Sequence, residues 1–330
     1  MSATSETPRP AAPDIDADDD RSPASLAALW VGVTVVLLAA LTIAGVLLVN
    51  LVGSAKEPFT AAEVPIDSPL HLRSTVRPPE VVHLAGSGSN LPLTRALAEA
   101  FQARSPNLHV VVFDSIGSTG AVAATYDDVI ELGLVSRPLK DSEAALDLLV
   151  HPYARVPVVV AVNLAVPDES ITTTDLVDIY AGRRRQWSDG TRIVVLQRER
   201  GDSSHRAVDE HLPAFEAVND AAYRENRWPI VESDQAMQEA LSITAGAIGL
   251  FDLGAIVLQR LPVKPLNIDE IAPSEASVQS GRYPVSKDLA FISVEQPGGA
   301  AAEFLRFVVE GEQARNLMRD SGYIPLPEDQ

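Results

Sequence analysis

Four stretches rich in glycine and hydroxyl side chains hold the residues that could do chemistry in this chain of 330 residues. Each lies between an apolar run, which predicts a strand, and a pattern of period 3.6, which predicts a helix. The first is Gly86-Ser87-Gly88-Ser89-Asn90-Leu91-Pro92, with Asn90 at the expected helix N-cap. Glycine lets the backbone turn sharply, and a helix N-terminus offers unpaired N–H groups and a partial positive charge. This combination suits a small oxyanion.

Three further bends repeat the arrangement. In the second, Ile116-Gly117-Ser118-Thr119-Gly120 puts Ser118 and Thr119 at a helix start. The third is Ser136-Arg137-Pro138, and the fourth is Arg198-Glu199-Arg200-Gly201-Asp202-Ser203-Ser204. An arginine fork can hold an oxyanion in a bidentate way. The alternatives are that the hydroxyls only cap helices and that the arginines form surface ion pairs.

The elements that carry these bends alternate between strands and helices. Strands are expected at 81–84, 108–113, 129–135, 156–162, 193–196, 247–251, 263–268 and 290–294. Such alternation predicts an α/β sheet with ligands at the carboxyl ends of its strands. Pro157 should confine the start of its strand to an edge or to a first position. Arg183-Arg184-Arg185 is interpreted as a solvated face.

Composition narrows the possible functions. The net charge is -19, from 26 Lys and Arg against 45 Asp and Glu, which disfavours a nucleic-acid binder. The absence of cysteine excludes disulfides, cysteine nucleophiles and thiolate metal sites. The six histidines show no metal-binding spacing, and no Gly-x-Ser-x-Gly elbow is present. We therefore expect that the protein binds no metal, uses no cofactor and is not an enzyme. A hydrolase using Ser118 or Ser203 is the less favoured alternative.

The N-terminal part predicts a membrane anchor. Leu26 to Val49 is a run of 24 uncharged residues, which is long enough to span a bilayer. We interpret 1–25 as a disordered acidic tail, 26–52 as a single transmembrane helix and 53–80 as a proline-rich linker. The alternative is a cleavable signal peptide, but its leader should be basic and this one is acidic. The large C-terminal part is then expected outside the cytoplasm, tethered to the cell membrane.

From about Val81 to Pro327 the chain resembles the phosphate-binding proteins of ABC transporters. The four bends carry this resemblance in order. Further matching pieces are Asp178-Ile179-Tyr180-Ala181-Gly182, Trp187-Ser188-Asp189-Gly190, Ala245-Gly246-Ala247-Ile248-Gly249 and Tyr283-Pro284-Val285-Ser286.

The resemblance implies the two-lobed periplasmic-binding-protein fold of type II, in which each lobe is a mixed sheet flanked by helices. Residues 81–158 and 264–330 would form lobe I, residues 159–263 would form lobe II, and the crossings between them would act as hinges. It further implies capture of phosphate, or a similar tetrahedral oxyanion, for uptake through ABC permease subunits or for sensing. An interaction module that kept the fold and lost the ligand is the alternative.

The site residues implied by the resemblance come from the same bends. They are Ser89, Asn90, Leu91, Ser118, Thr119, Ser136, Arg198, Asp202, Ser203 and Ser204. Two positions depart from the family pattern: Ser136 replaces a carboxylate that accepts the proton of phosphate, and Asp202 replaces a serine. Two like charges about 4 Å apart repel by about 4 kcal/mol at an effective dielectric near 20. We expect Asp202 to accept the proton of the ligand; the alternatives are that it turns away or that binding is altered.

Overall fold

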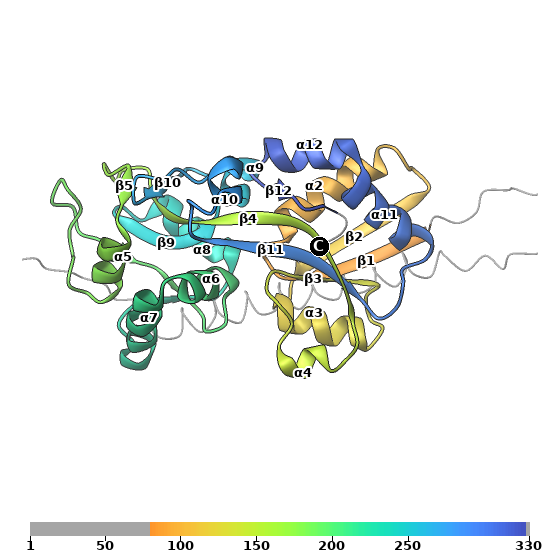
Figure 1. Cartoon of the computed structure of the whole chain (residues 1–330), viewed down its shortest axis with the longest axis horizontal. Helices are drawn as coiled ribbons and strands as arrows, with labels where there is room; N and C mark the ends of the chain where they lie inside the picture. The colour runs from red at the N-terminus through yellow and green to blue at the C-terminus, as the bar shows by residue number, and fades with distance from the viewer. Residues whose placement is uncertain (1–79, 328–330) are drawn as a thin grey trace, which may run out of the picture. The chain divides into compact units, whose positions relative to one another are not determined.

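Two long strands, β4 (Leu149–Asn163) and β11 (Ser286–Ser293), run through the centre of the computed structural model (Figure 1). The structure describes residues 80–327. The predicted acidic tail, membrane anchor and nearly all of the linker lie outside the described residues. Within residues 80–327, no helix is long and apolar enough to cross a bilayer.

The strands form a mixed sheet around this pair. The main path is β2 (Leu108–Ser115), β1 (Glu80–Gly86), β3 (Leu132–Val135), β11, β4, β10 (Val263–Ile268) and β5 (Ser170–Ile171). Strand β4 also pairs with β9 (Ala247–Asp252) and β12 (Ile324–Pro325), and β9 pairs with β6 (Val194–Val195). Strands β7 (Gln197–Arg198) and β8 (Ile230–Val231) make a separate parallel ladder. Because β1 is parallel to β2 and β3, their carboxyl ends meet at one edge of the sheet.

Helices cover the sheet on both sides. In the first lobe, α2 (Leu91–Gln102), α11 (Gly299–Glu310) and α12 (Glu312–Asp320) lie on one face, and α3 (Gly117–Tyr126) and α4 (Asp141–Ala144) lie on the other (Figure 1). The second lobe carries α5 (Thr173–Tyr180), α6 (Ser203–His211), α7 (Pro213–Glu225), α8 (Asp234–Ile243), α9 (Leu253–Gln259) and α10 (Glu275–Gln279).

Each lobe has its own apolar core. The first is built around the rings of Phe101, Phe291 and Phe304, whose neighbouring centroids are 5.4 and 5.9 Å apart. The second is built on the buried run 158–162 of β4 and also contains Tyr283 and Val285. The two-lobed α/β fold is therefore confirmed. The exact lobe boundaries stay a prediction.

The position of Pro157 differs from the prediction of an edge or a strand start. Pro157 lies in the interior of β4, opposite Ser286 of β11. It is tolerated because β4 changes partner at this point: from Val158 onward the strand pairs with β9 and β10. The next N–H, that of Val158, donates to Val285 O at 3.1 Å. Proline thus occupies the junction between two ladders, where its missing N–H interrupts neither.

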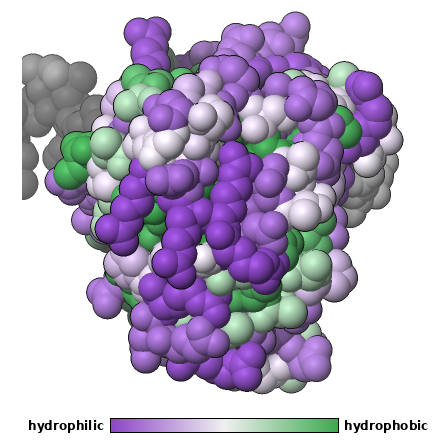
Figure 2. All heavy atoms as spheres, turned by 90° about the vertical axis from the view of Figure 1, so that its left-hand side faces the viewer, coloured by the Kyte–Doolittle hydropathy of each residue, from purple (hydrophilic) through white to green (hydrophobic). Residues whose placement is uncertain are grey.

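The arginine cluster after α5 is a polar surface, as expected. Arg183 pairs with Asp178 at 2.5 Å, and Arg184 pairs with Asp175 at 3.0 Å. The end of the molecule that carries α5 has hydrophilic side chains over most of its surface (Figure 2).

The core of the first lobe should depend strongly on Phe304, which is 0% exposed. We expect Phe304→Ala to lower the free energy of unfolding by about 3–5 kcal/mol, because the ring leaves a cavity that its neighbours cannot fill. Ile243→Ala, at a residue 74% exposed, is the control and should change it by less than about 0.5 kcal/mol. Calorimetric melting of the full chain measures both. Equal melting temperatures for the two variants would contradict this picture of the core.

Candidate functional site

A cavity of about 460 Å³ lies between the two lobes. Its wall comes from short segments at the starts of four helices: 87–88 before α2, 116–119 at α3, 201–203 at α6 and 232–234 at α8. The first N–H groups of a helix have no partner inside it, and they carry the positive end of the helix dipole. Four such ends at one cavity make it suited to an anion.

The first bend does not use its asparagine as expected. Asn90 occupies the N-cap position of α2, but its side chain makes no cap hydrogen bond. Instead its amide donates to Val135 O at 3.2 Å and to Tyr153 Oη at 3.1 Å. Asn90 is 0% exposed and does not line the cavity. Burial raises the pKa of Tyr153 to about 12, so that this phenol stays protonated. Asn90 therefore holds the first bend against β3 and β4.

The second and third bends meet through hydroxyls. Ser136 lies 2.7 Å from Ser87, Oγ to Oγ, and its N–H donates to Ser118 Oγ at 3.4 Å. Arg137, beside Ser136, donates to Thr119 Oγ1 at 3.0 Å and forms a buried bidentate pair with Glu143. The charge of Arg137 is thus neutralised, and this wall of the cavity offers neutral donors.

Arg198 is a buried cation surrounded by carboxylates. It is 4% exposed, and its guanidinium donates to both oxygens of Glu199, at 2.9 and 3.0 Å, and to Asp234 at 3.0 Å. Burial acts to lower its pKa, but the charges of Asp202, Asp234 and Glu199 outweigh this and raise it. The alternative of a surface ion pair is therefore excluded for Arg198.

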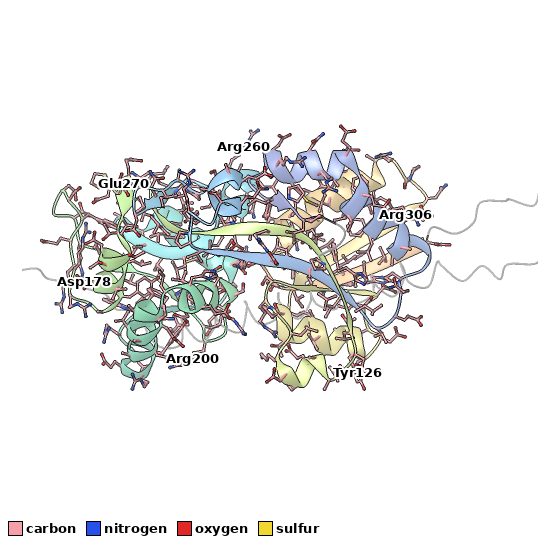
Figure 3. All side chains as sticks on the ribbon, viewed as in Figure 1. Tyr126, Asp178, Arg200, Arg260, Glu270 and Arg306 are labelled. Atoms are coloured by element: carbon pink, nitrogen blue, oxygen red, sulfur yellow. The ribbon has the colours of Figure 1, made fainter. Side chains whose placement is uncertain are left out.

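That alternative does describe Arg200. Its side chain pairs with Asp220 at 3.1 Å, and its guanidinium lies 4.4 Å from the ring centroid of Tyr223. Figure 3 shows Arg200 on the lower side of the second lobe, and its side chain is 58% exposed.

Asp202 is directed into the start of α6. Its Oδ1 accepts the N–H groups of Ser204 at 3.0 Å and His205 at 2.9 Å, and the imidazole of His205 at 3.3 Å. Its Oδ2 lies 3.4 Å from Arg198. Burial acts to raise the pKa of Asp202, but the hydrogen bond from His205 and the charge of Arg198 hold it well below the usual range. These contacts occupy Oδ1, while Oδ2 has only the ion pair with Arg198, so the proton-accepting role of Asp202 stays a prediction.

Two charged residues at or next to the cavity, Asp234 and Lys287, were not predicted from the sequence. Asp234 begins α8 and approaches the first bend so closely that a Cβ on Gly88 would collide with its carboxylate. Burial raises the pKa of Asp234, with the charge of Arg198 opposing this. Lys287, on β11, was overlooked because the pattern around it reads only as a turn and a strand. Its ammonium is buried among hydroxyls of both lobes.

The ten predicted site residues therefore separate into groups. Those that line the cavity are Ser118, Thr119, Ser136, Arg198, Asp202 and Ser203. Ser89 and Leu91 line an adjacent cavity, together with Gly88 and Asp234, which belong to both. Ser204 and Asn90 are buried behind the wall.

Comparison with known proteins agrees with this fold. A PBP superfamily domain matches residues 73–312. The chain belongs to the PBP superfamily. It is 25% identical over 254 residues to phosphate-binding protein PstS of Bacillus subtilis, covering 74% of this chain and 80% of that protein. It is 26% identical over 258 residues to protein SphX of Synechococcus elongatus, covering 73% and 76%.

A solved structure shares the superfamily fold. The phosphate-bound crystal structure of a phosphate ABC transporter substrate-binding protein of Clostridium perfringens superposes with a TM-score of 0.64 at 22% identity, covering 75% of this chain and all of that one. The resemblance stated from the sequence is confirmed. So is the prediction that the chain is not an enzyme, because its relatives in the PBP superfamily are binding proteins.

Behind Arg198, a buried polar network contains an unusual carboxyl group. Burial raises the pKa of Asp209 from 3.8 to about 6, against the opposing hydrogen bonds from Asn219 at 3.1 Å. The folded state therefore binds this proton more tightly than the unfolded state does. Stability falls as the pH rises from about 4 to 6, by about 1 kcal/mol once solvent screening is allowed for.

We expect Asp209→Asn to remove this pH-dependent loss of stability. The free energy of unfolding of the variant should exceed that of the wild type by about 1 kcal/mol at pH 8 and differ little from it at pH 4. Asp189→Asn, at an exposed turn where hydrogen bonds from Thr191 lower the pKa, should give no gain at pH 8. Melting at both pH values measures this, and carboxyl NMR should show a titration midpoint near 6 for Asp209. A midpoint near 4 would contradict the assignment.

Proposed function

We propose that this protein is a membrane-tethered solute-binding protein that captures phosphate, or a similar tetrahedral oxyanion, between its lobes. The observation that carries the proposal is the cavity at which four helices begin. Helix N–H groups and serine hydroxyls can surround an oxyanion without any change of protonation in the protein. The phosphate-binding names of its relatives support the same ligand.

The two lobes contribute differently to such a site. Helices α2 and α3 of the first lobe carry no acidic residue of their own in the first turn, and the carboxylate that approaches the bend before α2 belongs to Asp234 of the second lobe. In the second lobe Asp202 caps α6 and Asp234 begins α8. We infer that the first lobe holds the anion mainly through N–H and O–H donors. The second lobe closes over it.

The delivery step belongs to the same proposal. An anchor at 26–52 and a linker at 53–80 would place the binding lobes at the extracytoplasmic side of the cell membrane, beside ABC permease subunits. Transfer to such a permease, or to a sensor of the ion, would follow when the lobes open. The tether would keep the binding protein at high local concentration near its partner.

A ligand-free interaction module is the second candidate. It is favoured by the charges of the cavity wall, where three arginines (Arg137, Arg198, Arg200) face four carboxylates (Glu199, Asp202, Glu232, Asp234). A dianion gains no net attraction from such a wall.

We expect the full chain in mild detergent to bind phosphate, and Ser118→Ala to weaken binding about tenfold, because one hydroxyl donor is lost. Titration calorimetry with phosphate, sulfate and arsenate measures this. Ser242→Ala is the control, since its hydroxyl donates to Gln238 O within α8, away from the cavity. Absence of heat and of any rise in melting temperature with all three anions would favour the interaction module.

Asp202→Ser separates the helix-capping role of this residue from the effect of its negative charge on the ligand. Serine can still cap α6, while a negative charge beside the ligand is removed. Because Arg198 and the start of α6 hold Asp202 in its charged form, we expect phosphate binding by Asp202→Ser to tighten about tenfold. The same calorimetry measures it. If the variant bound phosphate more weakly at an unchanged melting temperature, the result would support the proton-accepting role of Asp202.

A further inference from the structure

The ammonium of Lys287 is a buried charge with four polar partners. Its Nζ donates to Ser89 Oγ, Ser203 Oγ and Ser204 Oγ, each at 2.8 Å, and it pairs with Asp252 at 2.9 Å. The residue is 7% exposed. Three of these partners are predicted site residues, yet Lys287 itself belongs to none of the four bends.

Hydrogen-bond accounting fixes the direction of these contacts. An ammonium has three N–H donors and no acceptor, and a hydroxyl has one donor and two acceptor positions. Each serine can therefore only accept from Lys287, and its own proton is directed to another acceptor. With Asp252 included, four oxygens share the three N–H groups, so at least one N–H is bifurcated. Ser204 has such a partner in Asp252, whose Oδ1 lies 3.3 Å from its Oγ.

The proton of Ser203 has no comparable partner among the described residues. Its hydroxyl oxygen lies 3.4 Å from Ser89 Oγ, which is a weak contact. Ser203 lines the cavity and stands at the start of α6. With its lone pair held by Lys287, its O–H is left to donate to a molecule in that cavity.

The same ammonium also reaches both lobes. Ser89 lies in the bend before α2 of the first lobe, while Ser203, Ser204 and Asp252 lie in the second. Lys287 stands on β11, one of the two strands that run between the lobes (Figure 1). A single buried charge thus fixes hydroxyls from the two lobes relative to one another.

We propose that Lys287 is a positioning residue of the anion site, which holds the Ser203 hydroxyl so that its proton is donated to the bound oxyanion. The inference rests on the proposed function. It assigns Lys287 an effect on affinity that acts through Ser203. The competing explanation is that Lys287 only neutralises the buried charge of Asp252.

The experiment is a phosphate titration of the full chain in mild detergent, by calorimetry, with the melting temperature of every variant recorded. Lys287→Met should raise the Kd about 30-fold, because an oriented donor to a charged ligand is lost. Lys264→Met is the matched control. Its ammonium, on β10, which pairs with β4, contacts the exposed Glu169, and its loss should leave the Kd unchanged.

A double-mutant cycle tests whether the effect acts through the hydroxyl. Once Ser203→Ala has removed the donor, adding Lys287→Met should weaken binding by less than about threefold. A purely structural lysine would instead give the same loss in both backgrounds.

The variant Lys287→Met/Asp252→Asn covers the possibility that Lys287→Met does not fold, because it leaves no unpaired buried charge. It should bind phosphate about as weakly as Lys287→Met. Wild-type affinity in this double variant, an unchanged Kd in Lys287→Met, or additive losses in the cycle would each overturn the inference and leave the proposed function standing. Failure of the wild-type chain to bind phosphate would instead refute the proposed function, and the inference with it.

Discussion

The unpaired N–H groups at the starts of four helices are the constraint on which the rest of this structure depends. Buried polar backbone groups at a cavity between two lobes must find partners, because a buried donor without one is strongly unfavourable. At α6 and α8 the chain supplies them from its own side chains, Asp202 and Ser233. At α2 the first N–H groups, those of Asn90 and Leu91, donate to backbone carbonyls of the preceding bend. At α3 no side-chain cap is formed, so the start of α3 is where an external acceptor is needed.

The features that the sequence predicted well are local ones. The bends could be recognised because glycine, hydroxyl side chains and helical periodicity lie within a few residues of each other. Ser118 and Thr119 stand at the start of α3 as expected, and the apolar run 158–162 is a buried strand. Local backbone preference and apolar periodicity suffice for such assignments.

The features that were missed depend on contacts between distant residues. Asn90 was expected to cap α2, but Tyr153, 63 positions later, takes its side chain instead. Lys287 meets Ser89 across 198 positions. Pro157 could not be placed correctly because the change of partner along β4 is set by β9 and β11. Neither composition nor periodicity carries information about which segments become neighbours.

The two buried cations show how an acidic protein can still present an anion site. Arg198 has three carboxylates within ion-pair distance, so its charge is compensated by groups of the second lobe. Lys287 contacts one carboxylate and three hydroxyl groups. By donating to the hydroxyl oxygen of Ser203, it orients an O–H group that lies at the cavity. Attraction at such a site comes from oriented neutral donors, which act at short range. It is consequently compatible with a net charge of -19, whose long-range field is screened within about 10 Å at ordinary salt.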